Sequence, residues 1–263
     1  MPSRDLSKLR ILVTGASGGI GRELVKQLAK SGARVCFTAR RADRIHALAS
    51  NLESAGIPTH QIAYAVGDII DSDVRRRLTS TCQDQFGGLD VLINNAGVGA
   101  VGPFADADPE RLRRLFEVNV FAPIELVRCT LPLLRKGKTP AIVNVGSVLA
   151  HFAVPNKSEY CATKFALRGF TDSLRAEMKR EGIDVISVHP NTTSSEFFDR
   201  LVEKKGKVAE NPIQMPADVA ARNILAAVSR GRAETVLSIT GKLSVFTARL
   251  APSIMRSIVR RFG

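Results

Sequence analysis

Tryptophan is absent from this chain of 263 residues, and tyrosine and cysteine are scarce. The four cysteines lie far apart with no Cys-x-x-Cys pair, which argues against the usual zinc and disulfide patterns. No apolar run approaches the roughly 18 residues of a membrane span. The first ten residues carry four charges and no apolar core, unlike a signal peptide. We therefore expect a reduced protein that works in the cytoplasm.

The charge is strongly one-sided, at a formal +13. Such an excess raises nucleic acid, a membrane surface or an anionic ligand as partners. The basic residues are dispersed, however, and most fall at helical spacing, as on solvated helix faces. Because no basic and aromatic residues interleave as in single-strand binders, we expect no nucleic-acid partner.

Short apolar runs alternate with longer amphipathic segments, which is typical of βαβ units and a parallel sheet. The runs, at 9–14, 34–39, 61–66, 91–94, 141–145, 185–189 and 235–239, are predicted strands. The predicted helices are 20–30, 42–54, 71–86, 109–134, 157–180 and 217–229. Most runs lack strict alternation, as expected for strands covered on both faces. The sequence predicts a doubly wound, seven-stranded parallel sheet in one domain, 1–263, with a basic C-terminal extension at 242–263.

A glycine-rich string, Thr14 to Gly21, follows the first predicted strand and opens a helix. Glycines there allow a tight turn and close backbone approach, and a helix N-terminus attracts a pyrophosphate. The simpler alternative is a turn without a ligand. The candidate cofactor-binding residues in the string are Gly15, Ser17, Gly18, Gly19 and Ile20.

The second predicted strand ends in Arg40 and Arg41. Proteins that bind NAD usually carry an acidic residue at this position, which hydrogen-bonds the ribose 2′-hydroxyl. Because a guanidinium pairs well with phosphate, the two arginines favour NADP(H) over NAD(H). The alternative is that both only start a solvated helix.

Tyr160 and Lys164 lie four residues apart in a predicted helix and so share one face. A nearby ammonium stabilises phenolate and lowers a tyrosine pKa from about 10, which suits proton transfer. Ser147 follows a predicted strand, at the sheet edge where α/β proteins bind ligands, and could hold a substrate oxygen. These three residues are the candidate catalytic group.

Together these motifs resemble the short-chain dehydrogenase/reductase family over about residues 8–240. The resemblance rests on the glycine string, Asn94-Asn95-Ala96-Gly97, Ser147, and Tyr160 with Lys164. It implies a nicotinamide-dependent oxidoreductase with Tyr160 as general acid/base, a small carbonyl or alcohol substrate, and a homodimer or homotetramer. It also implies that Asn119 joins a proton relay. The further cofactor contacts that it implies are Asp68, Ile69, Asn95, Ala96, Gly97, Tyr160, Lys164, Pro190 and Thr193.

Two alternatives stay open at this level. The same fold serves as a cofactor sensor or scaffold without turnover, although such a protein needs no proton relay. His151 lies between Ser147 and Tyr160 and could touch the substrate, whereas the other histidines are scattered without metal spacing. We expect no metal site.

The C-terminal tail is the last feature of the sequence. Residues 253–262 are predicted to form a helix whose Ile254, Ile258 and Phe262 face is buried against protein, because burying large side chains is favourable. The alternative is an anionic membrane surface, since the opposite face carries three arginines.

Overall fold

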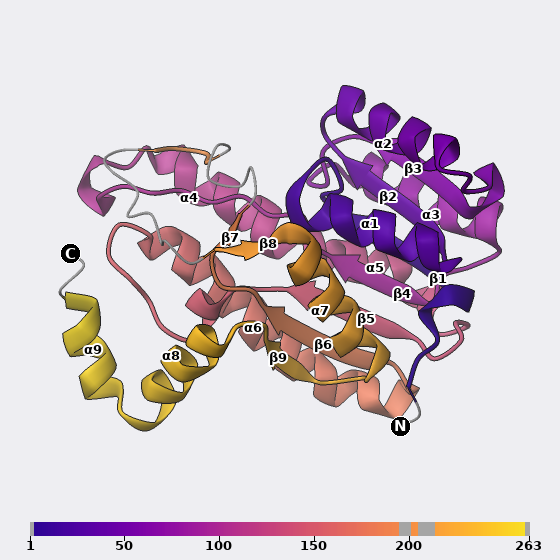
Figure 1. The fold of residues 1–263 in the computed structure, drawn as a ribbon. Helices are drawn as coiled ribbons and strands as arrows, with labels where there is room; N and C mark the ends of the chain where they lie inside the picture. The colour runs from indigo at the N-terminus through magenta and orange to yellow at the C-terminus, as the bar shows by residue number, and fades with distance from the viewer. Residues whose placement is uncertain (1–2, 195–200, 205–213, 261–263) are drawn as a thin grey trace.

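The computed structural model describes residues 3–194, 201–204 and 214–260. Its centre is a seven-stranded, all-parallel sheet in the order β3-β2-β1-β4-β5-β6-β9 (Figure 1). The strands are β1 Arg10–Thr14, β2 Arg34–Ala39, β3 Ile62–Val66, β4 Val91–Asn94, β5 Ala141–Val145, β6 Asp184–His189 and β9 Glu234–Val236. The predicted doubly wound sheet is therefore confirmed, with the strand order reversing between β1 and β4.

Helices cover both faces of the sheet. The α-helices are α1 Gly19–Ser31, α2 Ala42–Ser54, α3 Ser72–Phe86, α4 Pro109–Phe116, α5 Ala122–Leu134, α6 Ser158–Met178, α7 Ala217–Ser229, α8 Ile239–Leu250 and α9 Pro252–Arg260. One core cluster joins α1, α2 and α7 to Ile11 and Val13 of β1, and the other joins α3, α5 and α6 to Leu12. Successive residues of β1 thus pack into core clusters on opposite faces of the sheet, and the apolar run is unbroken because both faces are buried.

The predicted helix 109–134 is interrupted. Residues Glu117–Phe121 form a π-helical turn between α4 and α5, so the prediction of one regular helix is wrong. Pro123 contributes to the interruption because it has no N–H to donate to the carbonyl of Asn119, four residues earlier. Inserted π turns are frequent at functional sites.

The last strand and the tail also differ from the predictions. The strand ends at Val236 rather than at residue 239, because the Ser238 hydroxyl accepts from Gly241 N at 3.0 Å and starts α8 there. A small parallel pair, β7 Thr193–Ser194 with β8 Met215–Pro216, stands apart from the main sheet. Among the described helices, none is both long and apolar enough to cross a bilayer.

Within the described chain, the apolar face of the tail helix is exposed. Ile254 is 55% and Ile258 42% exposed, whereas Met255 is buried. The reason is that α9 packs mainly on α8, and this contact covers only the side of the helix that carries Met255. Phe262 lies outside the described residues.

Candidate functional site

A cavity of about 590 Å³ opens at the carboxyl ends of the central strands, where the strand order reverses. Ligands of open α/β sheets bind at such a switch point. The cavity brings together nearly every predicted site residue, with the exception of Asn119. Those residues are Gly15, Ser17, Gly18, Gly19, Ile20, Arg40, Arg41, Asp68, Ile69, Asn95, Ala96, Gly97, Ser147, Tyr160, Lys164, Pro190 and Thr193.

The glycine loop has no room for side chains at two of its positions. Gly15 has a φ of +74°, a region that disfavours other residues, and a Cβ on Gly21 would lie 2.2 Å from the Gly15 carbonyl oxygen. Asn95 Nδ2 donates to the Thr14 carbonyl at 2.9 Å, which ties the β4 turn to the loop. The loop is thereby held at the N-terminus of α1, where free N–H groups can meet a phosphate.

Arg40 and Arg41 both reach this end of the cavity. Arg41 Nη2 donates to the Ser17 carbonyl at 2.7 Å, so this guanidinium lies against the glycine loop. Burial and the neighbouring Arg44 lower the pKa of Arg41, which marks a site of crowded positive charge. Arg40 is about half exposed, and its Nη1 lies 3.9 Å from Asp68 Oδ2. The arrangement offers two cations to an anion bound beside the loop.

Tyr160 and Lys164 lie on α6 and face the cavity together. The Lys164 ammonium lies 5.5 Å from the centre of the Tyr160 ring. Burial raises the pKa of Tyr160 above its ordinary value, while a hydrogen bond with Ser147 acts in the opposite direction. Burial also lowers the pKa of Lys164 to about 8, so the amine stays largely charged at pH 7. The phenol is thus neutral beside a cation, as a proton donor requires.

Ser147 is the third member of the candidate catalytic group. It follows β5 as the N-cap of the 3-10 turn Val148–Ala150, where its hydroxyl oxygen accepts from Leu149 N at 3.2 Å. Because the cap holds the side chain in one rotamer, the hydroxyl stays directed at Tyr160.

Asn119 does not line the cavity, and its side chain is a buried brace. Its Oδ1 accepts from Val98 N at 2.9 Å, and its Nδ2 donates to Val98 O at 2.9 Å and to Thr163 Oγ1 at 3.1 Å. These bonds join the π turn to the end of the β4 loop and to α6. What Asn119 can present to a ligand is therefore its backbone carbonyl, which Pro123 leaves without the ordinary α-helical donor.

A buried ion cluster secures the start of α6. Arg111, buried on α4, pairs with Glu159, also buried, and its Nη1 donates to Glu203 Oε2 at 3.0 Å. Glu159 precedes Tyr160 on the helix, so the cluster anchors the turn that carries the phenol. Sequence reasoning missed these residues, because a charged residue gives no signal of burial before its partners are known.

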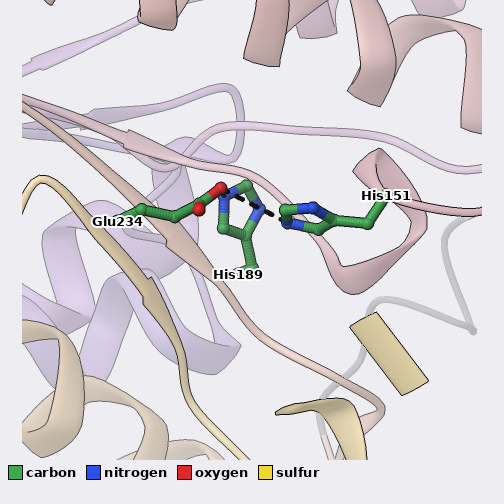
Figure 2. Close-up of side chains that lie close together, drawn as sticks. All are labelled: His151, His189 and Glu234. Atoms are coloured by element: carbon green, nitrogen blue, oxygen red, sulfur yellow. Dashed lines mark ion pairs between the residues drawn. The ribbon is translucent and has the colours of Figure 1, made fainter. Parts of the chain in front are cut away.

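A second cluster that the sequence did not reveal lies behind Ser147. The side chains of His151, His189 and Glu234 come from three separate elements and converge, with candidate ligand atoms within 4.8 Å of one another (Figure 2). His189 Nδ1 lies 3.0 Å from the Ser147 carbonyl oxygen, and its Nε2 lies 3.4 Å from Glu234 Oε1. His189, which the sequence placed among the scattered histidines, thus lies beside His151.

The charges around Glu234 determine whether this cluster could bind a metal ion. Arg249 Nη2 donates to Glu234 Oε2 at 2.8 Å, and Arg168 Nε lies 3.5 Å from Oε1. Two guanidiniums beside one carboxylate would repel a metal ion. Burial lowers the pKa of His151 to about 4, with His189 adding to the effect, so His151 is neutral at pH 7. We interpret the cluster as a charge network that supports the Ser147 turn.

Comparison with known proteins agrees with the geometry. The family model described as short chain dehydrogenase matches residues 9–206. Dehydrogenase/reductase SDR family member 7B of Bos taurus is 30% identical over 253 residues, covering 93% of this chain and 78% of that protein. Dehydrogenase/reductase SDR family member 7 of Homo sapiens is 33% identical over 200 residues, covering 75% of this chain and 59% of that protein.

Solved structures show the same fold. A short chain dehydrogenase from Burkholderia cenocepacia in complex with NADP superposes with a TM-score of 0.82 at 26% identity, covering 98% of this chain and 99% of that one. A short chain dehydrogenase/reductase from Burkholderia phymatum in complex with NAD has a TM-score of 0.85 at 19% identity, covering 95% and 96%, and shares the fold. With the family match over most of its length, this chain belongs to the short-chain dehydrogenase/reductase family of oxidoreductases.

Proposed function

We propose that this protein is an NADP(H)-dependent oxidoreductase that moves hydride between the nicotinamide and a carbonyl or secondary alcohol. The observation that carries the proposal is the convergence of Ser147, Tyr160 and Lys164 in one cavity with the glycine loop. The cofactor, when bound, supplies or accepts the hydride. The chain supplies the binding surface, the orientation of the substrate and the proton.

Each of the three side chains has a separate task in this proposal. The Ser147 hydroxyl holds the substrate oxygen, and the Tyr160 hydroxyl gives that oxygen its proton during reduction or takes it back during oxidation. Lys164 offsets the burial of Tyr160, because a nearby ammonium favours the phenolate that proton transfer leaves behind. In this proposal Lys164 also holds the ribose of the cofactor.

Asn119 contributes to the proposed proton route through its main chain. Its side chain is fully used as a brace, and Pro123 removes the donor that its carbonyl would otherwise have in a helix. The carbonyl can accept from a water, and through it the route would run from Lys164 toward bulk solvent.

The preference for NADP(H) over NAD(H) rests on the second strand. Arg40 and Arg41 line the cavity at the position where an acid would grip an unphosphorylated ribose. Arg41 contacts the glycine loop, and burial together with the charge of Arg44 lowers its pKa. Solved relatives were crystallised with either NADP or NAD, so the preference depends on these two arginines.

The proposal describes the substrate only by its size and polarity. The cavity volume of about 590 Å³ suits a small-molecule substrate. Its lining includes Leu149, Phe152 and Val154, which favour a substrate with an apolar part. Action as a single domain, assembly into a homodimer or homotetramer, and work in the cytoplasm stay predictions from the sequence.

The deciding experiment is Tyr160→Phe. General acid catalysis is worth about 10² to 10⁴ in rate, so turnover of NADPH with a panel of ketones, aldehydes and acyl thioesters should fall below about a hundredth of wild type. NADPH affinity, measured by fluorescence, should stay nearly unchanged. Tyr64→Phe is the matched control, because Tyr64 is the other tyrosine and lies 41% exposed on β3, outside the cavity. A wild-type protein that binds NADPH but turns over no substrate of the panel would favour a sensor or scaffold instead.

A further inference from the structure

The outer face of α8 carries a stripe of large apolar side chains in solvent. Ile239, Leu243, Phe246 and Leu250 recur at helical spacing and are 84%, 66%, 60% and 69% exposed. At about 100° per residue they fall within a narrow arc of the helix. The side of α8 that packs on the protein is a different one, marked by the buried Val245. The stripe is therefore continuous and turned outward.

The next helix carries two more exposed apolar side chains. Ile254 and Ile258 of α9 stand one turn apart and are also exposed, while Met255 packs inward. Figure 1 shows α8 and α9 side by side at one end of the molecule, away from α2 and α3 on the opposite edge of the sheet. We call the six residues Ile239, Leu243, Phe246, Leu250, Ile254 and Ile258 the apolar tail face.

Positive charge surrounds the apolar tail face. After Glu234 the sequence holds no acidic residue, while it holds Lys242, Arg249, Arg256, Arg260 and Arg261; of these, Arg249 is paired with Glu234. Lys242 is exposed beside the α8 stripe, and Arg256 and Arg260 are exposed on the other side of α9. A helix is about 10 Å across, which is close to the Debye length at physiological salt. The arginines on the far side of α9 are therefore still attracted to an anionic surface that contacts the apolar side.

We propose that the apolar tail face binds the surface of an anionic lipid membrane. The six apolar side chains would enter the interfacial region, and the basic residues would be attracted to acidic headgroups. A second copy of this chain is the poorer occupant, because two such faces would bring the same uncompensated positive charge together. This inference is independent of the proposed reaction.

The position of α8 links the membrane-bound face to the cavity. The helix packs on the 3-10 turn Val148–Ala150, and a Cβ on Gly241 would lie 3.0 Å from the Val148 side chain. Val148 itself lines the cavity. A membrane bound to the outer side of α8 would therefore be separated from this wall of the cavity by the thickness of one helix, about 10 Å.

The test is co-sedimentation with vesicles, using the full chain. The protein should bind vesicles of phosphatidylcholine with 30% phosphatidylserine at least tenfold more strongly than vesicles of phosphatidylcholine alone, and binding should fall steeply with added salt. Leu243→Ser with Phe246→Ser should reduce binding at least tenfold. Both side chains are exposed, so the fold should be retained, which NADPH binding and the melting temperature check.

Two controls distinguish binding through this surface from non-specific hydrophobic adsorption and from the effect of net positive charge. Phe104→Ser removes a side chain that is 69% exposed elsewhere and should change nothing. Lys242→Gln with Arg256→Gln and Arg260→Gln should weaken binding more than the loss of three exposed charges elsewhere, at Lys30, Arg76 and Arg113. Wild-type protein that ignores anionic vesicles would overturn the proposal, as would binding that survives the serine substitutions. A dimer that dissociates on Leu243→Ser with Phe246→Ser, without vesicle binding, would identify a second copy as the occupant.

Discussion

Replacing Lys164 by methionine should make the cofactor-free protein more stable at pH 7. Lys164 is 5% exposed, and among the described residues its Nζ donates one long hydrogen bond, of 3.5 Å, to the Val145 carbonyl. Burial lowers its pKa from an ordinary 10.5 to about 8. At about 1.4 kcal/mol for each pKa unit, holding the buried ammonium costs up to about 3 kcal/mol. Methionine has a similar shape and removes that charge.

The gain should depend on pH in a defined direction. Between about pH 8 and 10.5 the unfolded lysine binds a proton that the folded one has released, so the stability of the wild-type protein rises with pH there. The advantage of Lys164→Met should therefore be full below pH 8 and shrink toward pH 10. Chemical denaturation at pH 7 and pH 10, without cofactor, measures both values. Thermal melts at pH 7 should shift upward by roughly 5–10 °C.

Lys30→Met is the matched control, because Lys30 is an exposed lysine on α1 outside the cavity. Its stability difference from wild type should be small and nearly the same at both pH values. A Lys164→Met protein that is less stable than wild type at pH 7, or a gain that does not shrink by pH 10, would refute the reasoning. Turnover should fall in the same variant, because the ammonium that supports Tyr160 is gone.

Three further changes probe the cofactor site and the network behind it. Arg40→Ala with Arg41→Ala should weaken NADPH binding by about 10- to 150-fold and leave NADH affinity nearly unchanged, because a charge-assisted contact contributes about 1.5–3 kcal/mol. Equal losses of affinity for both cofactors in titrations would contradict the assignment. Gly21→Ala should reduce NADPH affinity more than tenfold, since its Cβ would lie 2.2 Å from the Gly15 oxygen, whereas Gly169→Ala, with nothing within 4 Å of its Cβ, should bind normally. Glu234→Gln should lower stability at pH 7 by about 1–3 kcal/mol, because two guanidiniums lose their shared carboxylate. Close contact with His189, supported by Arg249, holds the pKa of Glu234 well below its usual range. This contribution to stability is therefore present above about pH 4.5 and lost on acidification, and wild type and variant should converge in acid melts.

Local patterns in the sequence were sufficient for the sheet, the glycine loop and the Tyr160–Lys164 pair. Each depends on neighbours within a few residues: apolar runs of strand length, glycines before a helix, and two side chains one helical turn apart. The alternation of strands and helices then constrains the strand order, because parallel connections are right-handed. The cavity at the carboxyl edge follows from that order, whereas Asp68, Pro190 and Thr193 entered the prediction only through the family resemblance.

The tertiary structure alone decided the remainder. Glu234 meets His189 and Arg168 because β9 pairs with β6 next to α6, and no spacing in the sequence encodes that contact. Asn119 became a brace because a π turn, which lacks a simple sequence signature, rotates it toward Val98. The amphipathic pattern of the tail was visible from the start, but a pattern states only that one face is apolar. Whether that face is covered depends on what packs against it, and in the described chain Ile254 and Ile258 remain in solvent.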